Sequence, residues 1–219
     1  MLKLYGFPLS NYVNKVKFVL LEHEIPFEEI RANFGQDEAT LACSPLGKVP
    51  YVETESGPLA ESQAIIEYVA SVYRDKRIFS ADPYTAAKER EMIIVLETQL
   101  ELAARELYKQ AFFGGTVTDH TKVRSEKLLQ VGIAGLRRIS SFEPYALGAT
   151  FSIADVSAFV NLPLIGLTTK AVYGRDFLAD AGIDWKAHNT LIWERPAAQK
   201  VTADRKEFME AQRKQMPVF

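Results

Sequence analysis

Apolar and polar residues alternate in two different ways along the first part of the chain. Residues 2–5 alternate between apolar and polar positions, as a half-buried strand does. Apolar residues between positions 13 and 20 recur at helical spacing, which predicts an amphipathic helix ending near His23. Residues 25–30 then form a second strand pattern. This order predicts a β–α–β unit with a parallel pair of strands and a right-handed crossover.

A proline interrupts the next strand pattern. Three further elements follow the β–α–β unit, namely a short helix, a hairpin and an amphipathic helix, at residues 38–43, 51–60 and 62–73. Pro50 stands at the start of the hairpin, where it would remove a hydrogen-bond donor from the sheet. One resolution of this conflict is a cis Val49–Pro50 bond in a tight turn at the start of the strand. It would leave the N–H and C=O groups of Val49 free to pair with an extended, peptide-like ligand.

The pattern becomes helical after residue 83. Long helices are expected over residues 86–113 and 119–141, from Ser152 onward, and over residues 197–210. Ser152 and Asp155 have the spacing of a capping box, which is a structural feature of a helix start. We therefore predict an α/β domain at residues 1–78 and an all-α domain at residues 85–219, joined by a linker near residues 75–85.

Composition and charge exclude several classes of function. The 219 residues are 47% hydrophobic and 25% charged, with a net charge of −2. This balance allows a proper core and gives no basic excess for binding nucleic acid. No uninterrupted apolar run reaches the roughly 18 residues of a membrane span. No signal-peptide pattern begins the sequence, so a cytoplasmic protein without membrane association is expected.

Cysteine and histidine usage gives no metal site. The single cysteine, Cys43, excludes an internal disulfide and fits a reducing compartment, and we interpret it as an inert packing residue. The three histidines, His23, His120 and His188, are far apart, so no metal is expected.

An acidic residue and a serine open the helix that follows the hairpin. The Ser62 hydroxyl and the first N–H groups of this helix would offer a site for a carboxylate, next to Glu61. A donor and acceptor pair at Val49 beside an anion site suits a small, charged peptide.

Three stretches of the sequence together resemble a known family. They are Ser-Pro-Leu-Gly-Lys-Val-Pro at residues 44–50, Leu-Ala-Glu-Ser-Gln-Ala-Ile at 59–65, and Leu147-Gly148 followed by Phe-Ser-Ile-Ala-Asp at 151–155. The chain resembles the soluble, cytosolic glutathione S-transferases, in particular the serine-type theta- and phi-like classes of bacteria and plants. The resemblance implies a thioredoxin-like N-terminal domain that binds glutathione and an all-helical C-terminal domain. It also implies a homodimer and a role in detoxification.

The resemblance assigns the cosubstrate site residue by residue. It implies that the backbone of Val49, before Pro50, pairs with the cysteinyl part of glutathione. Glu61 and Ser62 would hold the γ-glutamyl end, and Lys48 would reach the glycyl carboxylate.

The loop before the short helix departs from the family pattern. Relatives of the serine type often carry a basic residue there to bind the glycyl carboxylate. Here Gln36 could form a hydrogen bond, whereas Asp37 would repel a carboxylate.

Ser10 is the candidate catalytic residue. A free thiol has a pKa of about 8.5, so the protein must stabilise the thiolate that attacks the electrophile. Ser10 lies between the first strand and the first helix, and resembles the catalytic position of the serine classes. Its hydroxyl can donate to the sulfur, while the helix N-terminus adds a favourable field. Asn11 and Tyr12 are the alternatives, and a simple helix cap is the structural interpretation of Ser10.

Aromatic residues are candidates for the pocket of the small-molecule electrophile. We predict that this pocket includes Phe7, Tyr12, Tyr108, Phe112 and Phe113, although aromatics at helical spacing also serve as core residues. Two other functions stay open. The same thiolate chemistry serves glutathione-dependent disulfide or peroxide reduction, isomerisation and dehalogenation, and a non-catalytic binding protein could keep the fold.

Overall fold

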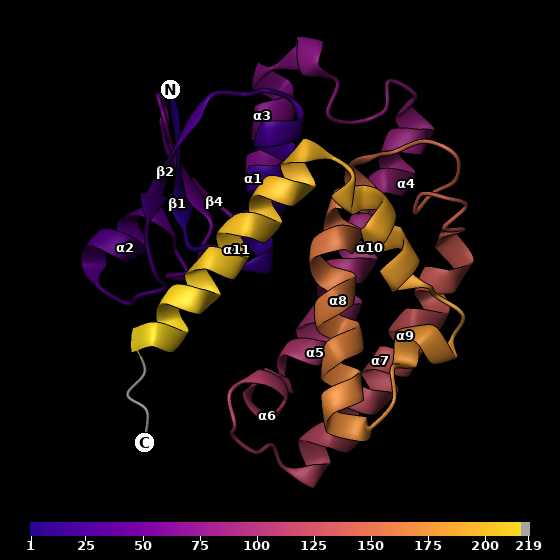
Figure 1. Ribbon diagram of the computed structural model, residues 1–219. Helices are drawn as coiled ribbons and strands as arrows, with labels where there is room; N and C mark the ends of the chain where they lie inside the picture. The colour runs from indigo at the N-terminus through magenta and orange to yellow at the C-terminus, as the bar shows by residue number, and fades with distance from the viewer. Residues whose placement is uncertain (216–219) are drawn as a thin grey trace. The chain divides into compact units, whose positions relative to one another are not determined.

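Contacts within the chain divide the protein into two units. The computed structural model describes residues 1–215 (Figure 1). The first unit contains Met1–Ile78 and the chain from Trp193 onward, and the second contains Phe79–Ile192.

A four-stranded sheet forms the first unit, in the order β2-β1-β3-β4. The strands are β1 (Leu2–Gly6), β2 (Phe27–Arg31), β3 (Tyr51–Thr54) and β4 (Gly57–Ala60). β1 runs parallel to β2 and antiparallel to β3, and β3 pairs antiparallel with β4. The predicted β–α–β unit and hairpin are therefore both present.

Five helical segments belong to the first unit: α1 (Asn11–Glu22), α2 (Glu38–Cys43), α3 (Ser62–Val72), η1 (Arg74–Lys76) and α11 (Pro196–Gln215). The core beneath α1 and α3 includes Leu4, Phe18, Val52 and Ile65, all at most 1% exposed. β2 starts two residues later than predicted, because the N–H of Ile25 donates to Leu20 O in the turn that ends α1.

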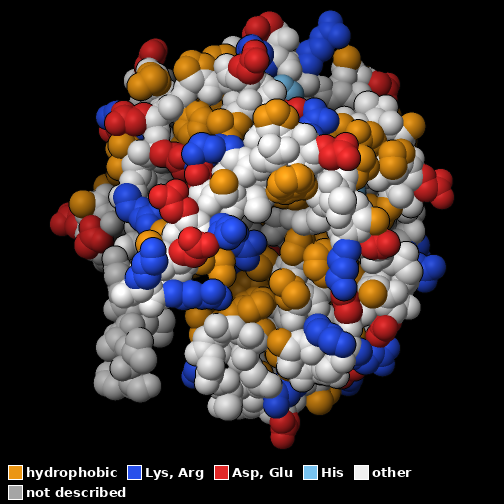
Figure 2. All heavy atoms as spheres, in the orientation of Figure 1, with side chains coloured by type: hydrophobic (Ala, Val, Ile, Leu, Met, Phe, Trp, Pro, Cys, Tyr) orange, Lys and Arg blue, Asp and Glu red, His pale blue; other side chains and the backbone are white. Residues whose placement is uncertain are grey.

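The last helix departs from the predicted division of the chain. Residues 85–219 were assigned to the helical domain, whereas α11 packs with the first unit. Ala197, Ala198 and Val201 are buried, and Arg195 forms an ion pair with Glu22 of α1. The face of α11 seen in Figure 2 carries charges of both signs. Helical periodicity predicts that α11 exists but not which unit its apolar residues cover.

The second unit is helical throughout its described elements. These are α4 (Pro83–Ile94), the π-helical segment η2 (Val95–Glu101), α5 (Leu102–Arg105), α6 (Tyr108–Phe112), α7 (Asp119–Ile139), α8 (Ile153–Tyr173), α9 (Phe177–Asp180) and α10 (Trp185–Trp193). The long helix expected over residues 86–113 is therefore interrupted: it contains a π-helical stretch, ends at Arg105 and is followed by the separate α6.

The helix α8 begins with the predicted capping box, which the structure confirms. The carboxylate of Asp155 accepts hydrogen bonds from the N–H of Ser152 at 2.8 Å and of Ala146 at 2.7 Å. Its Oδ1 also lies 2.9 Å from Nε2 of His188 in α10. Among the described residues, α8 is the one helix long and apolar enough to cross a membrane, but 61% of its apolar window is buried, as in a core helix.

Candidate active site

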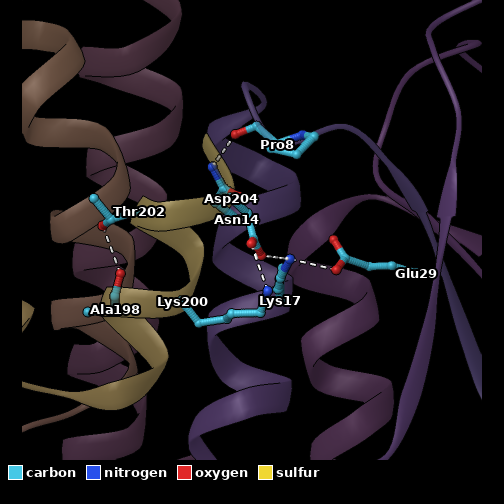
Figure 3. A network of polar contacts seen from close by, with 8 residues as sticks. All are labelled: Pro8, Asn14, Lys17, Glu29, Ala198, Lys200, Thr202 and Asp204. Carbon is cyan, nitrogen blue, oxygen red and sulfur yellow. Dashed lines mark hydrogen bonds and ion pairs between the residues drawn. The ribbon is translucent and has the colours of Figure 1, made fainter. Parts of the chain in front are cut away.

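The loop between β1 and α1 holds Ser10 in a fixed position. Ser10 is the N-cap of α1, and its Oγ accepts a hydrogen bond from the N–H of Val13 at 3.3 Å. The Ser10 N–H donates to Phe7 O at 3.1 Å. Nδ2 of Asn14 donates to Pro8 O at 2.8 Å, which ties the loop to the helix (Figure 3). Because Oγ acts as the acceptor in the cap, the hydroxyl hydrogen stays available for donation.

The two alternatives to Ser10 lie in the first turn of α1. Asn11 is buried, at 6% exposure, and Tyr12 is partly buried. A third hydroxyl nearby, that of Tyr5, donates to Glu53 at 3.2 Å, and its ring stacks on Tyr51. Burial, together with this hydrogen bond, raises the pKa of the Tyr5 phenol. The Tyr5 hydroxyl is thus committed to Glu53.

The Val49–Pro50 peptide bond is cis, as predicted. The turn ends directly at Tyr51, the first residue of β3. Among the hydrogen bonds within residues 1–215, none involves the N–H or C=O of Val49. The cis turn therefore presents an unpaired donor and acceptor beside the sheet.

The N-terminus of α3 has no capping side chain. In this respect α3 differs from α1, α2, α4, α7 and α8, whose N-cap side chains all accept a backbone hydrogen bond. Ser62, the first residue of α3, is 5% exposed, whereas Glu61 is exposed. Glu61 has φ 69° and ψ 118°, a conformation that non-glycine residues rarely adopt. Backbone strain of this kind clusters at binding sites, and no pattern in the sequence predicts it at Glu61.

A hydrogen bond between two glycines fixes the loop that precedes the cis turn. Gly47 has φ +63°, and its carbonyl accepts a hydrogen bond from the N–H of Gly35 at 3.0 Å. A Cβ at Gly47 would lie 1.9 Å from Gly35 O, so only glycine fits. Gln36 donates through Nε2 to Leu46 O at 3.3 Å, and Lys48 is exposed next to Gly47. The loop thus brings Gln36 and Lys48 to the same turn.

Asp37, the residue expected to repel a carboxylate, is the N-cap of α2. Its carboxylate accepts hydrogen bonds from the hydroxyl and the N–H of Thr40, at 2.7 and 2.9 Å. These hydrogen bonds lower the pKa of Asp37. Helix capping therefore explains why an aspartate stands in this loop, which differs from the family pattern.

Aromatic residues gather around Phe7 in the first unit. The Phe7 ring lies 6.2 Å from Phe34 and 6.4 Å from Phe208 of α11, between ring centroids. The guanidinium of Arg31 lies 4.1 Å from the centroid of Phe208. Phe7 was predicted from the sequence, whereas Phe34, Arg31 and Phe208 were not, because nothing in the sequence indicates that α11 returns to the first unit.

The other predicted pocket residues belong to the second unit. The hydroxyl of Tyr108 donates to the fully buried Glu101 at 3.1 Å, and its ring packs edge-on against Phe112. Phe112 is 40% exposed and Phe113 is 74% exposed, so neither is a core residue of this unit. The described residues contain no group of three or more His, Cys, Asp or Glu arranged to hold a metal ion.

Comparisons with known proteins agree on one family. Residues 4–77 match the family model "Glutathione S-transferase, N-terminal domain". A glutathione S-transferase of Pseudomonas putida strain F1 is 39% identical over 96% of this chain and 96% of its own length. Glutathione S-transferase 3 of Zea mays is 30% identical over 92% of this chain and 93% of its own.

A solved structure shows the same fold. Glutathione transferase F2 from Populus trichocarpa superposes with a TM-score of 0.74 at 24% identity, covering 94% of this chain and all of that one. The predicted fold class, a thioredoxin-like N-terminal domain followed by helices, is confirmed.

Proposed function

The chain belongs to the glutathione S-transferase family, and from this premise we propose how its first unit binds glutathione and activates the thiol. The protein is a glutathione transferase, which uses glutathione as the nucleophile against a small electrophile.

The register of the sheet is the observation that carries it. Tyr51 lies opposite Tyr5 of β1 and opposite Ala60 of β4. Three segments therefore lie at one edge of the sheet: the segment just before Tyr51, the one just after Ala60 and the one just after Gly6. These are the cis Val49–Pro50 turn, the uncapped start of α3 and the loop that carries Ser10.

Each of these segments would bind one part of the glutathione tripeptide. The free N–H and C=O of Val49 pair with the cysteinyl backbone as an added strand would. The γ-glutamyl carboxylate occupies the open N-terminus of α3, where the Ser62 hydroxyl and the helix field stabilise a negative charge. Glu61 contacts the γ-glutamyl amino group with a charge of the opposite sign.

The glycyl end meets the loop locked by Gly47. Lys48 supplies a cation for the glycyl carboxylate, and Gln36 adds a donor. Asp37 does not oppose this contact strongly, because its carboxylate already accepts two hydrogen bonds at the start of α2.

Ser10 completes the site chemically. Its hydroxyl donates to the glutathione sulfur, and the N-terminus of α1 adds positive potential, so the thiolate forms more readily. Each unit by which the thiol pKa falls corresponds to about 1.36 kcal/mol, which one good hydrogen bond and the helix field can supply. The thiol proton passes to solvent, and the thiolate sulfur then bonds to the electrophilic carbon as the leaving group departs with the electron pair of the broken bond.

The remaining features follow from the family. We propose that Phe7 and Tyr12 of the first unit contact the electrophile. A homodimer, a cytoplasmic location and a detoxification role are likewise proposals, for which the resemblance to the family is the support.

Measurement of the thiol pKa of bound glutathione in three variants tests the proposal. Thiolate absorbance is followed against pH in the wild type, Ser10→Ala and Ser10→Thr. We expect Ser10→Ala to raise the thiol pKa by about one unit and to lower kcat at neutral pH by about tenfold or more. Ser10→Thr retains a hydroxyl and should stay close to the wild type. An unchanged thiol pKa and rate in Ser10→Ala would overturn the role of Ser10.

A further inference from the structure

We propose that Arg31, with Phe7, Phe34 and Phe208, forms a subsite for a planar aromatic group that carries a negative charge. This inference rests on the proposed function, since the subsite would present such an electrophile to the thiolate at Ser10. It names the substrate class, which is an anionic aromatic electrophile, and Arg31 as the residue that selects it.

Arg31 is joined to the catalytic loop through the sheet. It is the last residue of β2 and lies opposite Gly6 in the parallel register with β1. The N–H of Ala32 donates to Gly6 O at 3.1 Å. Phe7 follows Gly6 directly and accepts the hydrogen bond from Ser10 through its carbonyl. The Arg31 guanidinium and the Ser10 hydroxyl therefore belong to adjacent segments at the same edge of the sheet.

The aromatic rings form an open surface around this point. Phe34 is 71% exposed and lies edge-on to Phe7, while Phe208 is partly buried and its ring centroid lies 6.4 Å from that of Phe7. The exposed Phe34 ring, next to the partly buried Phe7, is available to pack against a flat ligand, because aromatic pairs favour edge-on and offset contacts.

The positive charge at this surface is not neutralised by the protein. Within residues 1–215, Arg31 forms no ion pair, and its guanidinium stacks on Phe208 instead. Asp204, one helical turn before Phe208, is engaged by Lys17 and Lys200. A stacked guanidinium keeps its in-plane N–H groups free, so it can hold a carboxylate by two parallel hydrogen bonds.

A buried lysine fixes the two elements that carry the subsite. Lys17 is 2% exposed and lies 2.5 Å from both Glu29 of β2 and Asp204 of α11 (Figure 3). Arg31 is two residues after Glu29 and thus on the same face of the strand, and Phe208 is four residues after Asp204 and thus on the same face of the helix. The double ion pair of Lys17 therefore sets the register that stacks Arg31 on Phe208.

The reaction at this subsite is a nucleophilic aromatic substitution. The thiolate sulfur bonds to the ring carbon that carries chlorine, and chloride then leaves with the electron pair of the broken C–Cl bond. An electron-withdrawing nitro group makes the ring reactive, and the ring carboxylate pairs with Arg31. No co-reactant other than glutathione is needed.

A matched pair of electrophiles tests the proposal. The probes are 4-chloro-3-nitrobenzoate and its neutral analogue 4-chloro-3-nitrobenzamide, assayed with glutathione. We expect Arg31→Gln to lower kcat/KM for the benzoate by about tenfold, the size of one charge-assisted contact, and for the benzamide by less than about twofold. The KM for glutathione should not change. Arg31→Lys should retain part of the preference for the benzoate. It should lose the rest of this preference, because lysine lacks the planar guanidinium that forms two parallel hydrogen bonds with a carboxylate.

The control is Arg74→Gln, which removes one positive charge from an exposed arginine of the same unit that donates to Ser71 O. It should leave the ratio of the two substrates unchanged. An equal loss for both substrates in Arg31→Gln would overturn the proposal, as would no loss for either.

Equilibrium binding separates this proposal from the proposed function. Binding of 4-chloro-3-nitrobenzoate to the protein without glutathione is measured by calorimetry in the wild type and in Arg31→Gln. Weaker binding in Arg31→Gln supports the subsite even if the wild type conjugates neither probe, in which case the chemistry assigned to Ser10 fails alone. Equal binding in both proteins refutes the role of Arg31, whatever the turnover.

Discussion

Lys17 and Asp204 are 187 residues apart in the sequence, yet their side chains form an ion pair of 2.5 Å. The lysine is almost fully buried on α1, and the carboxylate comes from the helix that closes the chain. Lys17 also pairs with Glu29, whose side chain is 44% exposed, so Asp204 is its better shielded partner.

Asp204→Ala should lower the free energy of unfolding by about 3 kcal/mol, because it leaves a buried ammonium with one partly exposed partner. Urea unfolding followed by circular dichroism measures this change. Lys200→Ala is the matched control: it removes the other partner of Asp204, which is exposed, and should cost less than about 1 kcal/mol. Equal effects of the two variants would contradict this account.

The stabilisation by Asp204 should disappear in acid. Burial raises the pKa of this carboxyl, but hydrogen bonds from Lys17 and Lys200 outweigh burial and hold the pKa below its usual value of 3.8. The pKa of Asp204 is lower in the folded protein than in the unfolded chain. The stabilisation by Asp204 is therefore complete at pH values above the unfolded pKa, and it is lost as the pH falls through the folded pKa. The difference in unfolding free energy between the wild type and Asp204→Asn should therefore shrink from about pH 5 downward. A constant difference down to about pH 2 would refute this interpretation.

Glu61→Gly should separate stability from binding. Glycine relieves the cost of a positive φ, so the protein should gain about 1 kcal/mol of stability. If Glu61 binds the γ-glutamyl group as proposed, the KM for glutathione should rise about tenfold in Glu61→Gly, because the carboxylate is gone. Glu61→Gln is the control, since it keeps the Cβ and the strain while removing only the charge. Unchanged glutathione binding in Glu61→Gly would remove Glu61 from the site.

Gly47→Ala should distort the loop that carries Lys48. The new Cβ would meet Gly35 O at 1.9 Å, in addition to the strain of φ +63°. Gly174→Ala has a similar φ of +75° with nothing within 4 Å of the Cβ, so it isolates the cost of the backbone conformation. We expect about 1 kcal/mol for Gly174→Ala and clearly more for Gly47→Ala, measured by thermal unfolding. Only Gly47→Ala should also raise the KM for glutathione.

Asp155→Ala should destabilise the second unit far more than the loss of a helix cap. Asp155 is fully buried and binds Ser152, Ala146 and His188, so its removal leaves several buried polar groups unpaired. We expect a loss of about 3 kcal/mol or more, against about 1 kcal/mol for Ser152→Ala. Denaturant titrations of both variants test the difference, and similar values would show that Asp155 acts only as a cap.

Local rules predicted much of the first unit. The alternation in β1, the helical spacing in α1 and the proline before Tyr51 depend on neighbouring residues, so periodicity and backbone chemistry were sufficient. The capping box at Ser152 is local in the same way. The position of β2 was less accurate, since Ile25 completes the hydrogen bonding of α1 rather than starting the strand.

Long-range features could not be predicted in this way. The return of α11 depends on Lys17 meeting Asp204, and the aromatic surface depends on Phe208 meeting Phe7 and Arg31. The positive φ of Glu61 is imposed by the turn from β4 into α3, and no residue preference points to it. Such contacts are set by tertiary packing, which overrides local propensity.

Because α11 belongs to the first unit, the second unit is topologically an insertion within the first. Residues 1–78 are synthesised well before Asp204, so Lys17 lacks its partner on α11 while the rest of the chain is being made. The aromatic surface around Phe7 is then also incomplete, since Phe208 has not been synthesised. The first unit can therefore complete its packing only after the second unit has been synthesised, and a fragment ending at Ile78 lacks the helix whose Asp204 pairs with Lys17.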